Sequence, residues 1–422
     1  MNAKLVRWIC SYLLTAAFAP GLILSLPAQT KPPNAQTPLG ESSPTSDSGR
    51  QHAIELYRQG KNVEAMPLFE ILCAQYPGDN AMWEAWGVTT LGYSQILPDA
   101  DQRKKNRALA RSRLAKAKEL GDNSNLLQIL LSELPEDGGE GTYSPRKDVN
   151  DIMQQAEADF SRGDYDKARD GYLHALLLDP NNYDAALFMG DVFFKQHING
   201  SAGEWFARAI QIDPNRETAY RYWGDALWGL GKSADAREKY IQAIVAEPYG
   251  NKSWVGLTQW AQRSKVNLDW LRLQDKGSVT QKDDTHINIT IDEDSLKKKN
   301  DPSSSAWMMY SMERALWHGD KFKKEFPNET NYRRTMREEA DCLHLMVSVM
   351  TGQKGFEKRK KNMDSSLLQL VQIDQAGFLE PFALLNRADK EIAQDYIPYR
   401  NAHRETIYRY FDEYVVPKVP PQ

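Results

Sequence analysis

The chain of 422 residues contains only three cysteines, and this scarcity excludes a small fold that disulfides hold together. It also lacks a surplus of either charge, because 53 lysines and arginines stand against 57 aspartates and glutamates. A protein that binds nucleic acid through its charge needs a basic excess, so we expect no nucleic-acid partner. The composition also excludes collagen, coiled-coil, mucin and polytopic membrane classes, and is that of an ordinary globular protein.

The motifs of common catalytic and metal sites are missing as well. The sequence has no His-x3-His, His-Glu-x2-His or Gly-x-Ser-x-Gly pattern. Glu338, Glu339 and His344 lie close together, but Glu339 and His344 are five positions apart, which does not place them on one helix face. The segment 229–233 reads like the end of a phosphate loop, yet Ala226 stands where the first glycine belongs. We therefore predict no catalytic residue, no metal and no cofactor.

Residues 1–28 have the pattern of an export signal. Lys4 and Arg7 precede an uncharged apolar stretch that ends in Leu26-Pro27-Ala28. We predict a cleaved signal peptide and an exported protein, either periplasmic, in the cell envelope or secreted. An uncleaved anchor is the alternative, because the charge-free run is nearly long enough to span a bilayer, and it would then be the one contact with a membrane. Residues 29–49 are rich in proline and serine, which predicts a linker.

A period of 34 residues governs the first half of the chain. Pro180, Pro214 and Pro248 are spaced by 34, and an alanine stands five residues before each of them. The same frame repeats a pattern of alanine, aromatic residue, alanine and proline: Ala168, Tyr172, Ala175 and Pro180; Ala202, Phe206, Ala209 and Pro214; Ala236, Tyr240, Ala243 and Pro248. An earlier copy contains Ala65, Phe69, Leu72 and Pro77. Such a period predicts stacked repeats, each a pair of helices.

This pattern resembles the tetratricopeptide repeat family over residues 46–263. The resemblance implies a solenoid of antiparallel helix pairs. We predict a first block over 50–133, with two repeats and a long loop at Tyr93–Asn106 in the second. A connector over 134–148 leads to a second block over 149–263, with three repeats and a capping helix.

Residues 264–417 show no repeat and resemble no family that we recognise. Val266, Leu268 and Trp270 alternate with polar residues, as do the apolar residues of 286–291, which predicts a two-stranded ribbon with its turn at 275–277 or 282–284. Helical spacing follows in Trp307, Tyr310, Arg314 and Trp317, in Met336, Ala340, Leu343 and Val347, and again in segments starting near Leu367, Leu379 and Ile407. Asp301-Pro302 and Asp364-Ser365 look like helix starts. The predicted fold class is mostly α, a helix-turn-helix solenoid followed by a mainly helical C-terminal domain with a small β-ribbon.

The resemblance also implies a concave groove, because the first helix of each repeat in this family lines the inner surface. The ninth and twelfth positions of three consecutive copies, with one nearby basic residue, are Glu157, Phe160, Asp191, Phe194, Asp225, Trp228 and Arg221. An acidic and aromatic wall favours a cationic, partly apolar protein or peptide, through ion pairs and cation–π contacts. Two alternatives stay open: the acids form a solvated face while the aromatics pack between repeats, or the C-terminal domain itself fills the groove.

These features predict an exported, non-enzymatic scaffold that binds a protein or peptide segment in the groove. The alternative is an enzyme or ligand-binding protein in which the C-terminal domain acts and the repeats recruit its substrate. Converging ionisable groups in a C-terminal pocket would favour the alternative.

Overall fold

A computed structural model describes residues 44–97, 99–139, 142–281, 287–292 and 303–418. The predicted signal peptide over 1–28 therefore lies outside the described residues, as does most of the predicted linker. The helix α2 begins at Pro44, inside the segment predicted as linker. No helix of the described ranges is both long enough and apolar enough to cross a membrane. The chain divides into two compact units, one ending at Gln196 and the other starting at His197.

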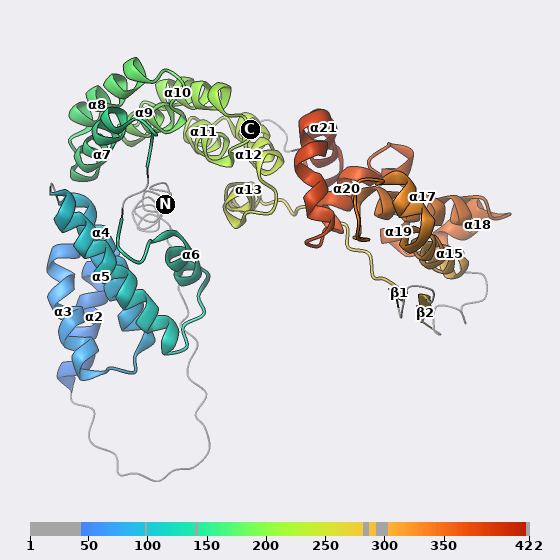
Figure 1. Cartoon of the computed structure of the whole chain (residues 1–422), viewed down its shortest axis with the longest axis horizontal. Helices are drawn as coiled ribbons and strands as arrows, with labels where there is room; N and C mark the ends of the chain where they lie inside the picture. The colour runs from blue at the N-terminus through green and yellow to red at the C-terminus, as the bar shows by residue number, and fades with distance from the viewer. Residues whose placement is uncertain (1–43, 98, 140–141, 282–286, 293–302, 419–422) are drawn as a thin grey trace, which may run out of the picture. The chain divides into compact units, whose positions relative to one another are not determined.

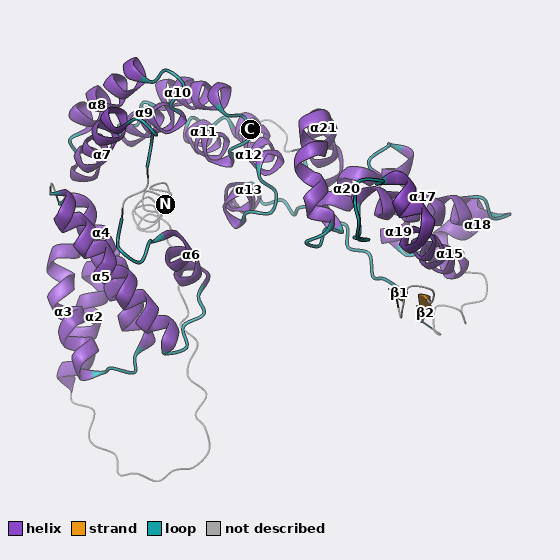
Figure 2. Cartoon of the chain, viewed as in Figure 1, coloured by secondary structure: helices purple, strands orange, loops and turns teal. Residues whose placement is uncertain are grey.

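The first unit is built from helices in which neighbours along the chain pack together, as the period predicts (Figures 1 and 2). Small residues allow this close packing: a Cβ atom added to Gly171 would lie 2.7 Å from the Cβ of Ala156 on the preceding helix. The helices are α2 (Pro44–Arg58), α3 (Asn62–Gln75), α4 (Asn80–Ile96), α5 (Ala100–Glu119), α6 (Asn125–Glu133), α7 (Lys147–Arg162), α8 (Tyr165–Leu178) and α9 (Tyr183–Lys195).

The long loop predicted at Tyr93–Asn106 is wrong, because both helices of this repeat extend into it. The helix α4 continues to Ile96 and α5 begins at Ala100. Asp99 caps α5 by accepting a hydrogen bond from the backbone N–H of Gln102 at 2.8 Å. The basic run that suggested a loop lies instead on the first turns of α5, where Arg103 donates to the carbonyl of Leu97 at 3.1 Å.

The segment between α6 and α7 corresponds to the predicted connector over 134–148, and its described residues form no helix before Lys147. It is tied to helices on both sides. Lys104 pairs with Asp137 at 2.9 Å, and Arg107 donates to the carbonyl of Gly139 at 2.9 Å. Farther along, Arg146 donates to the carbonyl of Leu178 at 2.7 Å. These contacts attach the connector to both blocks of the first unit, where α4 also packs against α7.

The second unit contains the rest of the repeats and the whole C-terminal domain. The turn at 229–233, which resembled a phosphate loop, joins two paired helices, with Gly231 at a φ of +75°. The elements are α10 (Asn199–Ile212), α11 (Glu217–Gly229), α12 (Ser233–Ala246), α13 (Asn251–Arg263), β1 (Gly277–Gln281), β2 (Ile287–Ile291), α15 (Ser303–Leu316), the π-helical turn η1 (Trp317–Lys321), α16 (Phe322–Glu325), α17 (Met336–Thr351), α18 (Phe356–Arg359), η2 (Lys360–Asn362), α19 (Ser365–Gln375), α20 (Leu379–Asn386), η3 (Ile392–Asp395), α21 (Tyr396–Tyr410) and η4 (Phe411–Val415).

The last repeat and the C-terminal domain share one hydrophobic core, which extends from Leu227 to Val416. Hydrogen bonds reinforce this packing, because α21 approaches the end of α12. The hydroxyl of Tyr396 donates to the carbonyl of Val245, and Arg400 donates to that of Ala246, each at 2.7 Å. The boundary predicted at 263/264 therefore separates a repeat segment from a non-repeat segment, but not two independent cores.

The predicted β-ribbon exists, but its first strand is displaced. β1 pairs antiparallel with β2, with Val279 opposite Ile289, whereas 264–276 form no strand. Val266, Leu268 and Trp270 pack instead against the shared core. The N–H of Asp269 donates to the carbonyl of Val415 at 2.8 Å, so the backbone of this segment is bonded to the end of the chain's last helical turn and not to the ribbon. A turn at 275–277 is therefore wrong, and 282–284 lie outside the described residues.

The helical spacing predicted for the C-terminal domain is confirmed. Most of the predicted inner residues of α15 and α17 are buried, including Trp307, Tyr310 and Leu343, whereas Arg314 and Met336 are half-buried. The predicted start at Asp364 is also confirmed, because its carboxylate accepts a hydrogen bond from the N–H of Ser366 at 2.8 Å. The predicted start at 301–302 lies outside the described residues.

Candidate functional site

The groove residues predicted in the first unit lie on α7 and α9. Glu157 and Phe160 are half-buried on α7, and Glu157 accepts a hydrogen bond from the hydroxyl of the buried Tyr172 on α8. Phe160 packs edge-on against Tyr165, with ring centroids 5.4 Å apart. Asp191 is buried on α9, and Phe194 is half-buried near its end. Both aromatic side chains thus keep part of their surface exposed.

The groove residues predicted in the second unit lie on α11, and all three contact other residues of the chain. Arg221 is buried and forms a bidentate ion pair with Glu217, at 2.8 and 3.2 Å. Burial disfavours its charge, but the carboxylate of Glu217 outweighs this effect and raises the pKa of Arg221. The guanidinium of Arg263 lies 5.7 Å from the ring centroid of the half-buried Trp228. Trp228 therefore offers a more accessible surface than the buried Arg221.

The acids at the ninth position have a structural task in two of the three copies. The hydroxyl of Tyr240 donates to Asp225 at 2.8 Å, as that of Tyr172 does to Glu157 two repeats earlier. Burial raises the pKa of Asp225 above the ordinary range, despite nearby Arg221. The interpretation of these acids as a freely solvated face therefore does not hold for Asp225. The corresponding position between the two tyrosines is Phe206, which has no hydroxyl.

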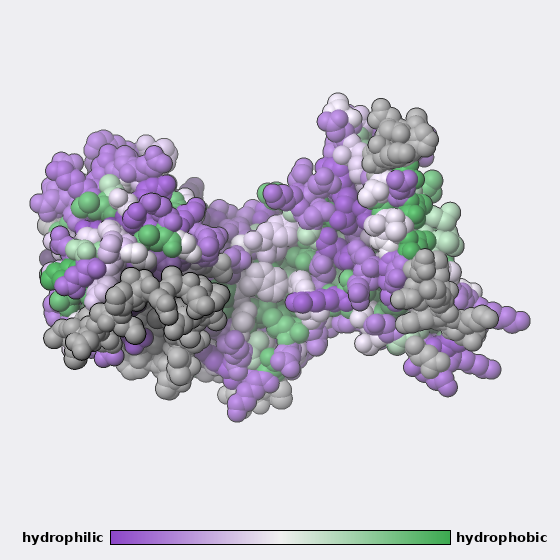
Figure 3. All heavy atoms as spheres, turned by 90° about the horizontal axis from the view of Figure 1, so that it is seen from below, coloured by the Kyte–Doolittle hydropathy of each residue, from purple (hydrophilic) through white to green (hydrophobic). Residues whose placement is uncertain are grey.

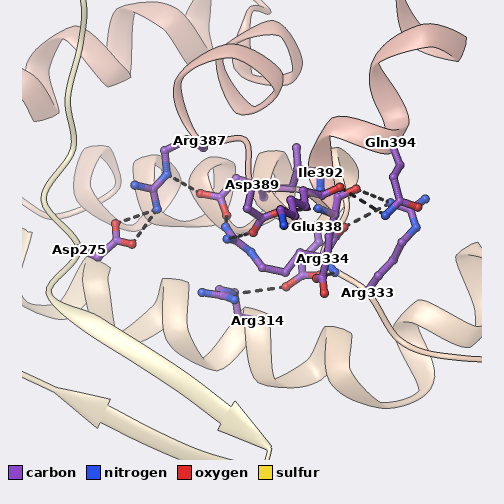
Figure 4. Close-up of polar contacts among 12 residues, drawn as sticks. Asp275, Arg314, Arg333, Arg334, Glu338, Arg387, Asp389, Ile392 and Gln394 are labelled. Carbon is purple, nitrogen blue, oxygen red and sulfur yellow. Dashed lines mark hydrogen bonds and ion pairs between the residues drawn. The ribbon is translucent and has the colours of Figure 1, made fainter. Parts of the chain in front are cut away.

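A second cluster of charges lies in the C-terminal domain and centres on the buried Glu339. Arg334 approaches its carboxylate at 2.7 Å, Arg387 at 2.8 Å, and the hydroxyl of Tyr310 at 2.9 Å. Arg387 also pairs with Asp275, as Figure 4 shows. Burial alone would raise the pKa of Glu339, but the two guanidinium groups outweigh it and lower the pKa.

Glu338, the neighbour of Glu339, is equally buried but less well compensated. The hydroxyl of Tyr332 donates to its carboxylate at 2.9 Å, while Arg314 lies at 3.4 Å. Burial raises the pKa of Glu338 to about 7. The ring of His318 stacks on that of Tyr332 with centroids 3.9 Å apart. Burial and nearby Arg314 lower the pKa of His318. A carboxyl with a raised pKa and an imidazole with a lowered pKa therefore both contact Tyr332.

The sequence pointed to Glu338 and Glu339 but not to their partners. Arg314 comes from α15, Arg334 from the segment before α17, and Arg387 from the end of α20. These residues lie up to 73 positions apart, between 314 and 387, so no local spacing connects them. One signal was available: the adjacent Arg333 and Arg334 stand just before the two acids. Arg333 serves another acid, Asp395, at 2.7 Å.

Metal-ligating side chains and thiols are two other groups that could carry chemistry. The described residues contain no group of three metal-ligating side chains close enough to hold an ion. Cys73 and Cys342 are both buried free thiols. Burial raises the pKa of Cys73 to about 12 and raises that of Cys342 further, so neither is a ready nucleophile.

Comparison with known families decides what the paired helices are. Residues 153–217, from α7 to the start of α11, match a model of the tetratricopeptide repeat. Residues 153–217 are tetratricopeptide repeat sequence. No curated protein matches the sequence.

Solved structures that share the repeat resemble the chain at low identity. The first tetratricopeptide domain of Spaghetti, bound to an HSP90 peptide, is 21% identical; the match covers 29% of this chain and 98% of that one, with a TM-score of 0.27. MamA is 18% identical, covering 49% and 94%, with a TM-score of 0.24. The TPR2AB domain of yeast Sti1, in complex with pHSP90, is 14% identical, covering 52% and 96%, with a TM-score of 0.26.

Within these tetratricopeptide repeats, α7, α9 and α11 each carry one half-buried aromatic residue at the twelfth position: Phe160, Phe194 and Trp228. Their common position in the repeat frame assigns them to the same side of their helices. An aromatic face attracts both apolar groups and cations, so each of these side chains offers a surface to either kind of group.

Proposed function

We propose that the chain is an exported, non-enzymatic scaffold whose tetratricopeptide repeats bind a cationic, partly apolar segment of another protein. The observation that carries the proposal is the contact of Arg263 with Trp228 at 5.7 Å. It shows a guanidinium beside the aromatic residue of one repeat. We infer that Phe160 and Phe194 receive arginine or lysine side chains of a partner in the same way.

We infer that the acids at the ninth position act by giving this surface a negative potential, and not by forming new ion pairs with a partner. Asp225 is engaged by Tyr240, and Glu157 by Tyr172, so a partner meets carboxylates that are already oriented. Oriented acids favour a cationic partner through complementary potential, which acts mainly on specificity and association rate. The aromatic side chains are then the main source of affinity.

Synthetic peptides test this proposal directly. We expect a peptide of alternating arginine and leucine to bind the protein through Trp228, and its glutamate counterpart to show no binding that depends on Trp228. Trp228→Ala should weaken binding about tenfold or more. Trp205→Ala is the matched control, because Trp205 on α10 also lies near an arginine, Arg208, at 5.3 Å, but belongs to a second helix. Equal dependence of both peptides on Trp228, or equal loss in both variants, would contradict the groove.

Export is tested on the full chain expressed in a secreting host. The basic residues Lys4 and Arg7 and the apolar stretch that follows them support cleavage after Ala28. Amino-terminal sequencing of the exported protein should therefore begin at Gln29. A chain that starts at Met1 and stays with the membrane would show an uncleaved anchor instead.

A second candidate function assigns chemistry to the C-terminal domain. It is favoured by Glu338, whose pKa is raised to about 7, beside Tyr332 and His318. A carboxyl with such a pKa suits general acid–base catalysis. Any activity found in a screen should then be lost in Glu338→Gln and kept in Glu413→Gln, a change at the exposed ion pair with Arg409. An activity that survives Glu338→Gln would remove this candidate.

A further inference from the structure

The solvent-facing side of α15 is apolar. Met308, Met312 and Leu316 recur every fourth residue, so they form one stripe along the helix, and they are 39%, 46% and 62% exposed. The opposite side of α15 contains the buried Trp307 and Tyr310 and packs against α17. A helix of a globular domain usually places polar residues toward solvent, so this stripe lacks the usual polar cover.

The hairpin lies beside α15 and carries another exposed apolar residue, Ile289. A Cβ atom added to Gly277 would meet the hydroxyl of Ser311 on α15 at 2.4 Å, so this face of the hairpin adjoins the helix. Ile289 pairs with Val279 on the same face, two positions from the pair of Gly277 with Ile291, and is 40% exposed. In Figure 3 hydrophobic residues gather on the C-terminal domain between hydrophilic ones.

Basic residues lie at both ends of the stripe. At its start, Gln353 donates to the hydroxyl of Ser305 at 2.9 Å, which brings the segment after α17 to the first turn of α15. That segment, 354–361, contains four lysines and one arginine against a single acid, Glu357, in a chain whose net charge is −4. At the other end, η1 and then α16, with the exposed Lys323 and Lys324, follow Leu316.

The lysines of the first end are available to a partner. Lys354, Lys358 and Lys361 are exposed, and within the described ranges no ion pair holds their ammonium groups. Glu357 pairs with Lys360 at 2.5 Å instead. An apolar stripe with positive charge at both ends complements an amphipathic segment that carries an apolar face and acidic ends. Methionine side chains, being flexible and polarisable, suit such a contact.

We propose that α15 and the basic segment 354–361 form a second docking surface, which binds an acidic amphipathic segment of another protein. This surface is independent of the proposed groove and selects the opposite charge. The methionine stripe provides contact with the apolar side of the segment, and the lysines provide orientation and faster association.

The test uses the full chain and two synthetic amphipathic helices, identical in their leucines, with either glutamate or lysine at the polar positions. The lysine peptide is cationic and partly apolar, so any binding of it belongs to the proposed groove and should be unchanged in variants of this second surface. At this surface we expect only the glutamate peptide to bind. Met312→Glu should weaken its binding about tenfold, because the change puts a like charge on the apolar contact. Lys358→Glu with Lys361→Glu should weaken it by at least as much and remove most of its salt dependence.

Matched controls separate this result from a general effect of charge. Leu177→Glu changes an equally apolar residue that is 80% exposed on α8, and Lys105→Glu with Lys118→Glu makes the same charge reversal on α5. Both controls should bind the glutamate peptide as the unchanged protein does. Trp228→Ala, which tests the groove, should also leave this binding intact.

Three results would overturn the proposal. One is failure of the glutamate peptide to bind the unchanged protein. Another is an equal loss in the α15 variants and in the controls. The third is binding of anionic phosphatidylserine vesicles in place of the peptide, which would assign the surface to a membrane.

Discussion

The repeats and the C-terminal domain hold their buried charges in different ways. In the repeats, a tyrosine that lies 15 residues further along the chain holds the acid: Tyr172 holds Glu157, and Tyr240 holds Asp225. In the C-terminal domain, Glu339 is held by Arg334, Arg387 and Tyr310, which come from three separate segments. In a periodic fold the same local pair of acid and tyrosine can recur in more than one repeat. The non-periodic domain instead needs one network, which is complete only when all its segments have folded together.

The largest expected effect breaks the network of the C-terminal domain. Glu339→Gln preserves the volume but leaves Arg334 and Arg387 without their shared carboxylate. We expect the free energy of unfolding to fall by about 3–5 kcal/mol, the usual result of breaking a buried ion pair. Chemical denaturation measures it. Glu413→Gln, at an exposed pair, should change stability by less than about 0.5 kcal/mol. Equal effects of the two changes would contradict the central role of Glu339.

The next effect sharpens the comparison through pH. Because the pKa of Glu338 is raised to about 7 from 4.5, the folded state holds this proton more tightly than the unfolded state. Its stabilising contribution is complete below about pH 4.5 and is lost as the pH rises through about 7. In that window we expect stability to fall by up to about 1.4 kcal/mol per pH unit.

Denaturation at several pH values, for the unchanged protein and for Glu338→Gln, isolates this contribution. The variant should lose that part of the slope. The lowered pKa of His318 has the opposite effect on stability, since its stabilising contribution is lost as the pH falls below 6.5. His318 is present in both proteins, so this contribution does not distinguish them. Identical slopes above about pH 5 would show that Glu338 does not titrate near neutrality.

A smaller effect tests helix packing in the repeats. A Cβ atom added to Gly224 would lie 2.6 Å from the ring of Tyr240, so Gly224→Ala should destabilise by about 1–3 kcal/mol. Gly200 on α10 is the matched control, because a Cβ atom there meets no heavy atom within 4 Å. Gly200→Ala should be neutral or slightly stabilising, by up to about 1 kcal/mol. Thermal melts distinguish the two, and a stable Gly224→Ala would refute the close approach.

The smallest effect compares one repeat with another. Tyr240→Phe removes the hydroxyl that donates to Asp225 and should cost about 1 kcal/mol in the free energy of unfolding. The ring itself stays, and Phe206 at the equivalent position shows that the repeat accepts phenylalanine. A loss as large as that of Glu339→Gln would mean that the repeats, too, depend on a connected network.

The same difference explains how much the sequence could predict. The helix pairs followed from the period, because Pro180, Pro214 and Pro248 mark a pattern that local residues carry. The groove positions followed from the resemblance, but their partners did not. The equal separation of Glu157 from Tyr172 and of Asp225 from Tyr240 was visible, yet it acquires meaning only when two antiparallel helices bring these side chains together.

The C-terminal domain was predictable only as helices. The spacing of Trp307 and Tyr310 placed an inner face on α15, but nothing local indicates that Arg387, 48 residues away, meets Glu339. The displaced first strand has a similar cause. The alternation of apolar and polar residues at Val266–Trp270 is typical of a strand. Here, however, the apolar side chains pack against the shared core, and the backbone N–H of Asp269 donates to the carbonyl of Val415 instead of to a neighbouring strand.

Arg237 on α12 belongs to the last repeat, but the groups that pair with it are synthesised much later. Its buried guanidinium contacts Asp412 at 2.5 Å and donates to the carbonyls of Val416 and Pro417. During translation α12 leaves the ribosome about 170 residues before these acceptors, a difference read from the numbering. The nascent last repeat therefore carries a charge that stays uncovered until residues 412–417 have also left the ribosome.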